Sequence, residues 1–363
     1  MEKWRIQSCD DLYEILHTEE NELQKILESK KSGYYYYKID KFSPKKIRKK
    51  DRIDDISKER IIHVLRRDAR IRILQKNLSE NFLSKHILFP DCVYGFLRER
   101  SYEDFLYAHI SERKDRVLFR LDIRDFFDSI RYKDLQEALE YYISPECGAE
   151  EKKKILDLLC QTVTLNHHLV QGAVTSPLLS NLVFRSLDIR IMRYCQNSGV
   201  RYTRYADDML FSVETKGILK TGKLNENSPK KEIRKCLDAY INRFIKRIAA
   251  IISEKGFELN YAKTVRGIGE LSLGGFVIGN EVRLARKKQH NLNKMLYDCS
   301  MTLQLDYRNK LAGFRSFYIQ MLRYATQPHT QESLKRRIRQ IEETLDRINA
   351  KLPVDSVILD ECI

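Results

Sequence analysis

The chain has 363 residues, of which 66 are lysine or arginine and 51 are aspartate or glutamate, so its formal net charge at pH 7 is +15. This length is enough for a large core divided among roughly two or three subdomains, and the basic excess favours a polyanionic partner such as nucleic acid. The sequence holds no run of about 18 apolar residues, which excludes a membrane-spanning helix. It shows no apolar signal-peptide core and no C-x-x-C pair among its eight cysteines, so we expect a cytoplasmic protein without a zinc site or a disulfide framework.

The N-terminal part combines an amphipathic segment with two clusters of basic residues. Apolar residues recur at helical spacing through residues 10–30, which predicts one helix there. Four consecutive tyrosines at 34–37 predict either a surface on which bases stack or a strand whose faces are alternately buried. One basic run spans residues 45–52, and the second consists of Arg60, Arg66, Arg67, Arg70, Arg72 and Lys76.

An apolar segment further along the chain ends in an acidic residue. The residues from Val117 to Leu121 predict a buried strand, and Asp122 falls at its end. A carboxylate at the end of a strand can form one side of a metal site. Asp125 and Asp128 follow closely, and we interpret them as the acidic first turn of a helix, where they suit the helix dipole.

A loop and a long helix come next. The segment from Gln171 to Asn181 reads QGAVTSPLLSN. Ser176 as the cap and Pro177 as the first helical residue predict a helix start, and the apolar residues that follow at helical spacing are typical of a core-facing surface. The small residues that begin with Gly172 would let a base pair or a template strand approach closely.

The segment from Tyr202 to Ser212 predicts a β-hairpin with two acids, Asp207 and Asp208, at its tip. Most adjacent Asp pairs form solvated turns, but two like charges side by side are unfavourable unless a cation binds them. Together with Asp122 they supply the hard oxygen ligands that Mg²⁺ prefers. Three such carboxylates can hold two metal ions that activate the attacking oxygen and stabilise the leaving oxygen in phosphoryl transfer.

The rest of the chain is predicted to be mainly helical. Residues 216–231 are polar and predict an exposed loop, and residues 233–256 predict a helix that ends near a glycine. From residue 286 onward the sequence is basic and helical, with a heptad seam formed by Leu334, Ile338, Ile341, Leu345, Ile348 and Leu352. We favour packing within a helical bundle over dimerisation through this seam.

In this order the segments resemble the palm of reverse transcriptases, and specifically the bacterial retron-type enzymes of the group II intron-like branch. The segment that begins at Gln171 resembles the QGxxTSPxLSN motif of that branch, and Tyr205 to Asp208 match its YADD box. Residues 260–264, NYAKT, resemble the next box, and residues 273–278, LGGFVI, resemble the primer-grip hairpin.

The resemblance implies an α+β fold of the right-hand polymerase type, with an antiparallel palm sheet flanked by helices. It divides the chain into an N-terminal helical extension (1–37), fingers (38–115), a palm interleaved with the fingers (116–285) and a helical thumb (286–363).

The resemblance also implies roles for single residues. Asp122, Asp207 and Asp208 would be the catalytic aspartates, and together with the backbone carbonyl of Ile123 they would be the ligands of two Mg²⁺ ions. Phe127 would block a 2′-hydroxyl and so select deoxynucleotides; the alternative is a plain core aromatic, because Phe126 is adjacent and only one ring can face the site. The other nucleotide contacts would be Arg60, Gln171, Gly172 and Lys263, and the primer and template contacts would be Tyr205, Gly274 and Gly275.

The activity that the resemblance implies is RNA-directed DNA synthesis. By likeness to retron enzymes, the chain would use dNTPs to reverse-transcribe part of a cognate structured non-coding RNA into a linked RNA–DNA product (msDNA). This product would act in antiphage defence, with an effector protein as a further partner.

Three departures from the retron pattern leave the RNA partner open. Only His109 matches the N-A-x-x-H motif, Leu273 to Gly275 stand where retron enzymes have V-T-G, and Val170 replaces the proline before Gln171. Two alternatives therefore stay open: a non-retron defence or abortive-infection reverse transcriptase, and an RNA–DNA scaffold that restrains a toxic effector. An RNA-dependent RNA polymerase is disfavoured by Phe127 and by Ala206, where a glycine is usual.

Overall fold

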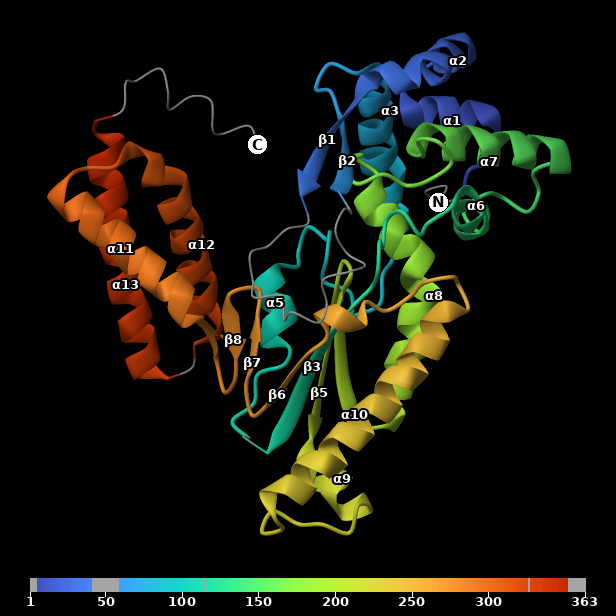
Figure 1. Ribbon diagram of the computed structural model, residues 1–363. Helices are drawn as coiled ribbons and strands as arrows, with labels where there is room; N and C mark the ends of the chain where they lie inside the picture. The colour runs from blue at the N-terminus through green and yellow to red at the C-terminus, as the bar shows by residue number, and fades with distance from the viewer. Residues whose placement is uncertain (1–4, 41–58, 114, 326, 352–363) are drawn as a thin grey trace.

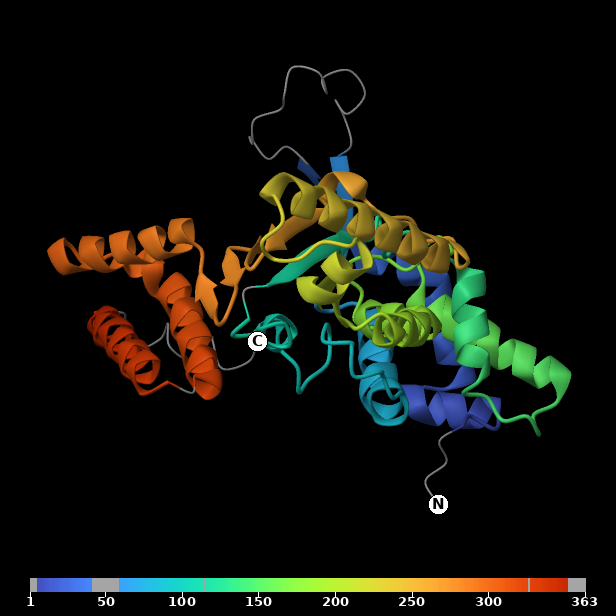
Figure 2. The same ribbon diagram turned by 90° about the horizontal axis from the view of Figure 1, so that it is seen from below.

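The computed structural model describes residues 5–40, 59–113, 115–325 and 327–351, and it shows a mixed α and β architecture (Figure 1). A four-stranded antiparallel sheet lies at the centre of the molecule. The N-terminal helices and the C-terminal helices form lobes on opposite sides of it, as the view from below also shows (Figure 2). The predicted α+β fold is confirmed, whereas the basic run at 45–52 lies outside the described residues.

The N-terminal lobe consists of short helices around a two-stranded ribbon. Its first elements are α1 (Cys9–Leu16), α2 (Glu20–Ser29), the 3₁₀ turn η1 (Lys30–Gly33) and the antiparallel strands β1 (Tyr34–Asp40) and β2 (Glu59–Leu65). They are followed by α3 (Arg70–Leu78), the π-helical turn η2 (Ser79–Leu83), α4 (Ser84–His86), α6 (Tyr132–Glu140) and α7 (Ala149–Val163). The prediction of one helix over residues 10–30 is wrong, because His17 takes a left-handed conformation (φ 51°) that ends α1.

The four consecutive tyrosines lie in strand β1. Of the two predictions for this segment, a base-stacking surface or a strand, the structure shows the strand. Tyr34 is buried, but Tyr35 and Tyr36 are both exposed, with 47% and 64% of their surface accessible. The strand therefore does not alternate strictly, and it presents two neighbouring rings to solvent.

The central sheet is formed by β4 (Val200–Tyr205), β5 (Asp208–Glu214), β3 (Arg116–Asp122) and β6 (Val265–Ile268), in the order β4-β5-β3-β6. Neighbouring strands are antiparallel throughout. The helices α8 (Ser176–Asn197) and α10 (Lys230–Ser253) pack on one face, where Phe244 of α10 meets Phe119 and Phe211 of the sheet with ring centroids 5.5 and 5.4 Å apart.

Strand β3 is apolar at nearly every position because both faces of the sheet are covered. Val117, Phe119 and Leu121 belong to the large core that includes α8 and α10. Leu118 points the other way, into a second core shared with the short helix α5 (Tyr102–Tyr107) and the C-terminal elements. A strand buried on both faces carries a continuous rather than an alternating apolar pattern.

The second core joins a small antiparallel sheet to a three-helix bundle. The sheet is formed by β7 (Leu271–Leu273), β8 (Phe276–Ile278) and β9 (Val282–Leu284), and the bundle by α11 (Arg286–Met301), the 3₁₀ turn η4 (Leu305–Tyr307), α12 (Arg308–Tyr324) and α13 (Pro328–Asn349). The heptad residues from Leu334 to Ile348 are buried in this core, so the prediction of packing within a bundle is confirmed; Leu352 lies outside the described residues.

Two segments differ from the loops and helices predicted for them. Residues 216–231 are not one exposed loop, because α9 (Thr215–Thr221) buries Ile218 and Leu219 against the core. Residues 124–129 form a turn rather than a helix start, and Asp125 takes a left-handed conformation (φ 43°) that helical geometry does not allow.

The start of α8 also differs in detail. Thr175 is the N-cap residue, and Ser176 and Pro177 are the first two helical residues.

Within the part of the chain that the structure describes, no helix is both long and apolar enough to cross a bilayer.

A fully buried ion pair connects α8 to the sheet. Arg204 of β4 donates from Nε and Nη2 to the two carboxylate oxygens of Asp188, at 2.9 and 2.6 Å, and from Nη1 to Asn181 Oδ1 at 3.0 Å. Tyr202 donates to the same carboxylate at 2.8 Å. Every nitrogen of the guanidinium is used, and one also reaches the carbonyl of Ala206 at the hairpin tip.

Removal of one partner of this pair should strongly destabilise the fold. Asp188→Asn leaves the Arg204 charge buried without its counter-ion, and we expect a loss of about 3–5 kcal/mol in the free energy of unfolding, measured by urea denaturation. The matched control is Glu214→Gln, which breaks the exposed Arg113–Glu214 pair and should cost less than about 1 kcal/mol. Equal losses in the two variants would contradict this assignment.

Candidate functional site

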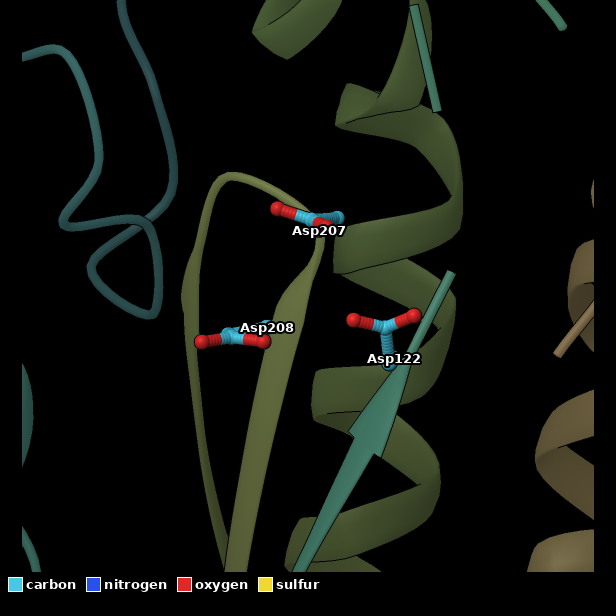
Figure 3. Close-up of side chains that lie close together, drawn as sticks. All are labelled: Asp122, Asp207 and Asp208. Atoms are coloured by element: carbon cyan, nitrogen blue, oxygen red, sulfur yellow. The ribbon is translucent and has the colours of Figure 1, made fainter. Parts of the chain in front are cut away.

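Three carboxylates meet where β3 ends beside the hairpin of β4 and β5 (Figure 3). The antiparallel register places Asp122 directly opposite Asp208. Asp207 occupies the tip of the hairpin, where Ala206 supplies the positive φ of 54° that the tight turn requires. One oxygen from each carboxylate lies within 4.8 Å of the others. The predicted grouping of these three acids is therefore present in the folded chain.

Backbone hydrogen bonds hold the three carboxylates in place. The amide of Ile123 donates to the carbonyl of Asp207 at 3.0 Å, which ties the end of β3 to the hairpin tip. Asn260 donates in turn to the carbonyl of Asp122 at 2.8 Å. The predicted role of the Ile123 carbonyl as a metal ligand stays a prediction.

Burial makes ionisation of the two hairpin acids unfavourable. Burial raises the pKa of Asp208 to about 6; the guanidinium of Arg120 lowers it in part, and the charge of Asp207 adds to the increase. Burial also raises the pKa of Asp207, and the neighbouring charge of Asp122 raises it further. Desolvated carboxylates this close together gain stability from a bound cation.

The oxygens present fit a hard divalent cation. All three side chains offer carboxylate oxygens, which Mg²⁺ prefers over nitrogen or sulfur ligands. Oδ2 of the fully buried Asp122 accepts no hydrogen bond of good geometry, although Lys263 Nζ lies 3.1 Å away. An acceptor left over in this position is what a metal ligand would leave in the metal-free state.

Two cations contact the acids from the protein side. Arg120 donates from Nη2 to Oδ1 of Asp122 at 3.0 Å and also to Oδ1 of Asp208. Lys263, at the end of the 3₁₀ turn η3 (Tyr261–Lys263), donates from Nζ to Asp122 at 3.1 Å. Lys263 was predicted to lie at the site, but Arg120 was not. The signal for Arg120 is its position two residues before Asp122, because alternate residues of a strand share a face.

The two phenylalanines after Asp122 differ in how deeply they are buried. Phe126 is buried in the core against Phe184 and Phe257, with ring centroids 5.7 and 5.8 Å away. Phe127 is only half-buried, and its ring centroid lies 6.1 Å from that of Phe96. Phe127 also packs against the edge of this core, so the choice of Phe127 as the residue that blocks a 2′-hydroxyl stays a prediction.

Gly172 lies close to the backbone of β2. It has a φ of 97°, and a Cβ atom there would lie 2.3 Å from the carbonyl oxygen of His63 in β2. The glycine is therefore required for packing of the loop against the N-terminal ribbon, and Gln171 beside it is half-buried. Arg60 lies on the same strand β2, opposite Ile39, but its side chain is outside the described part.

The predicted primer residues are joined by an aromatic contact. The ring of Tyr102 lies 5.1 Å from that of Tyr205 and 5.9 Å from that of Phe276. Gly274 and Gly275 form the turn between β7 and β8 with φ of 59° and 86°, and a Cβ on Gly274 would meet the Tyr102 hydroxyl at 2.7 Å. Tyr102 was not singled out from the sequence, yet it connects this turn to the hairpin that carries Asp207 and Asp208.

Comparison with known proteins gives consistent matches. The family described as "Reverse transcriptase (RNA-dependent DNA polymerase)" matches residues 47–278. The chain is 28% identical to the Retron Mx65 reverse transcriptase of Myxococcus xanthus over 77% of this chain and 61% of that protein. It is 30% identical to the Retron Ec73 reverse transcriptase of Escherichia coli over 42% of this chain and 49% of that protein. It is 25% identical to the Retron Ec86 reverse transcriptase, also of Escherichia coli, over 69% of this chain and 68% of that protein. The matched regions thus span about half to two-thirds of these relatives.

The desolvated acids should limit the stability of the metal-free protein. Folding raises the pKa of Asp207, so the ionised carboxylate lowers the free energy of unfolding. This destabilisation is absent below the unfolded pKa of about 3.9, where Asp207 is protonated in both states, and it is complete once the pH exceeds the raised folded pKa. Asp207→Asn should therefore raise the melting temperature at pH 8 without metal, and this gain should narrow toward pH 4. The same variant should lose the increase in melting temperature that Mg²⁺ gives the wild-type chain.

The control for this experiment is Glu214→Gln, at the exposed end of β5 that lies far from the hairpin tip. It removes one negative charge without touching the three acids, so it should keep the response to Mg²⁺. An Asp207→Asn variant that is less stable than wild type at pH 8 without metal would contradict the electrostatic account.

Proposed function

The chain belongs to the reverse transcriptase family and, by the relatives that it matches, to the retron type, and on this premise we propose that it is an RNA-directed DNA polymerase. It would reverse-transcribe part of a cognate structured non-coding RNA into a linked RNA–DNA product. The observation that carries the proposal is the convergence of Asp122, Asp207 and Asp208 at one end of the central sheet.

The three carboxylates are the proposed ligands of two Mg²⁺ ions. When bound, these ions would supply the charge that activates the primer hydroxyl and stabilises the leaving phosphate in an in-line displacement. The protein contributes a rigid frame: the register of β3 and β5 fixes two acids, and the hydrogen bond from Ile123 to Asp207 fixes the third. A site fixed before substrate binds needs little reorganisation during reaction.

The surrounding side chains are proposed to bind the nucleotide and the primer. Lys263 stands beside Asp122 and is more than half exposed, so its ammonium can reach an incoming triphosphate. Phe127 would exclude a 2′-hydroxyl by steric contact. Arg60, Gln171 and Gly172 would add nucleotide contacts, and Tyr205, Gly274 and Gly275 would contact primer and template.

The subdomains are proposed to follow the usual division of a right-hand polymerase. Residues 1–37 would be an N-terminal extension, 38–115 the fingers, 116–285 the palm and 286–363 the thumb. The excess of 66 basic over 51 acidic residues supports a nucleic-acid partner in this arrangement. We further propose a cytoplasmic location and a part in antiphage defence, with an effector protein as a further partner.

Loss of the hairpin acids should separate synthesis from RNA binding. The double variant Asp207→Asn, Asp208→Asn should reduce primer extension by about 10³-fold or more, because it removes two of three metal ligands. RNA affinity, measured by filter binding, should change by less than about threefold, since the acids make no favourable contact with phosphate. Primer extension by the double variant at near wild-type rate would refute the assignment.

The retron-type product can be tested on the purified chain from its native operon. Treatment of the copurifying nucleic acid with RNase and DNase separately should reveal one discrete DNA that shifts in size after RNase. This DNA should be absent when both hairpin acids are replaced. RNA alone would favour a scaffold, and DNA of no defined sequence would favour a non-retron defence polymerase.

The assignment of Phe127 as the sugar filter gives an independent prediction. Phe127→Ala should reduce discrimination against ribonucleotides by about tenfold or more, because it removes the group that clashes with a 2′-hydroxyl. Single-nucleotide extension with dNTP and rNTP measures the ratio of kcat/KM. The matched control is Phe126→Leu, which should lower stability but leave the ratio unchanged; the reverse pattern would assign the filter to Phe126.

A further inference from the structure

Arg120 lies between two of the catalytic acids. Its side chain is only 14% exposed. Its Nη2 donates to a carboxylate oxygen of Asp122 on β3 and to one of Asp208 on β5. Its Nη1 donates to the carbonyl of Lys263 at 3.2 Å. The guanidinium therefore bridges the same carboxylates that are proposed to hold metal.

Arg120 and Arg204, the buried arginine of β4, differ in how their guanidinium groups are hydrogen-bonded. Arg204 uses all three guanidinium nitrogens, and two of them engage both oxygens of Asp188. In Arg120, one nitrogen is shared between two carboxylates, and Nε is buried without a hydrogen-bond partner among the described residues. A cation with an unused donor and a shared contact is held by charge more than by geometry, so it is easier to displace.

The charge balance of the site gives Arg120 a consequence for metal binding. With the acids ionised, Arg120 and Lys263 offset two of the three negative charges. This makes the metal-free site stable enough to persist in the folded chain. The same positive charge repels a divalent cation that approaches the carboxylates, since like charges interact strongly in a partly buried site.

We propose that Arg120 is an internal counter-ion that competes with the metal ions for Asp122 and Asp208. This inference rests on the proposed two-metal function. Arg120 keeps the empty site from binding divalent cations tightly, and the negative phosphates of an incoming nucleotide then tip the balance toward the metal-loaded state. Arg120 is thus a positioning residue that sets when the metal enters, and it takes no part in the chemical step.

The test measures the binding of Mn²⁺ to the full chain in the absence of nucleic acid. The electron paramagnetic resonance signal of free Mn²⁺ reports how much of the metal remains unbound. Arg120→Met and Arg120→Gln should each bind Mn²⁺ about tenfold or more tightly than wild type, because a repelling charge is gone. Arg120→Lys keeps the charge and should bind like wild type. Arg266→Met is the matched control: this arginine lies on the adjacent strand β6 and pairs with Asn242 and Asp238 instead of the catalytic acids, so its loss should leave Mn²⁺ affinity unchanged.

Thermal melting gives a second readout. Without metal, Arg120→Met should melt at a lower temperature than wild type, and Mn²⁺ should raise its melting temperature by more than it raises that of wild type. Weaker or equal Mn²⁺ binding in folded Arg120→Met and Arg120→Gln would overturn the proposal, as would failure of both variants to fold even with Mn²⁺.

Failure of the proposed function would look different. If Asp207→Asn removes no Mn²⁺ binding from either the wild-type chain or Arg120→Met, the three acids are not a metal site, and the two-metal mechanism falls along with the inference. If wild type binds and the Arg120 variants do not bind more tightly, only the inference falls.

Discussion

The register between β3 and β5 is the constraint on which the site depends. It sets Asp122 opposite Asp208, and a shift by one residue would turn the carboxylate of one strand to the other face of the sheet. The register is fixed by the two cores, because the alternate residues of β3 are buried against helices on one face and against α5 and the small sheet on the other. The buried Arg204–Asp188 pair then holds the hairpin against α8 and reaches its tip through Ala206. The arrangement of the three carboxylates is thus a consequence of how the sheet is packed.

The site itself opposes folding, and the surrounding protein compensates. Asp207 and Asp208, whose pKa values are raised, are half-buried beside the buried Asp122 at one end of the sheet. Arg120 and Lys263 provide the nearest opposite charges. Such strain is common where function needs a charge arrangement that the fold alone would not favour. The aromatic chain from Tyr205 through Tyr102 to Phe276 extends the same frame to the glycine turn that is proposed to contact the primer. The three acids and the glycine turn are therefore parts of one packed unit.

Much of this could be predicted from sequence, because the signals were local. Apolar periodicity and turn residues predict the strand that ends at Asp122 and the hairpin with Asp207 and Asp208. They also predict a helix over residues 233–256, which the structure has at Lys230–Ser253. What was missed depends on tertiary contacts. Arg204 and Asp188 are 16 residues apart and meet only when α8 packs on the sheet, and the close contact of Gly172 with His63 joins segments distant in sequence. α9 was missed because its two buried apolar residues, Ile218 and Leu219, are surrounded by polar residues and glycine.

The central claim is that Asp122, Asp207 and Asp208 together hold divalent metal during DNA synthesis. The most direct measurement is anomalous diffraction from a crystal of the chain with primer, template, Mn²⁺ and a non-hydrolysable dNTP analogue. The account predicts anomalous peaks in contact with carboxylate oxygens of all three residues and with the phosphates of the nucleotide. Nucleotide bound without such peaks, or Mn²⁺ bound only elsewhere on the chain, would contradict it.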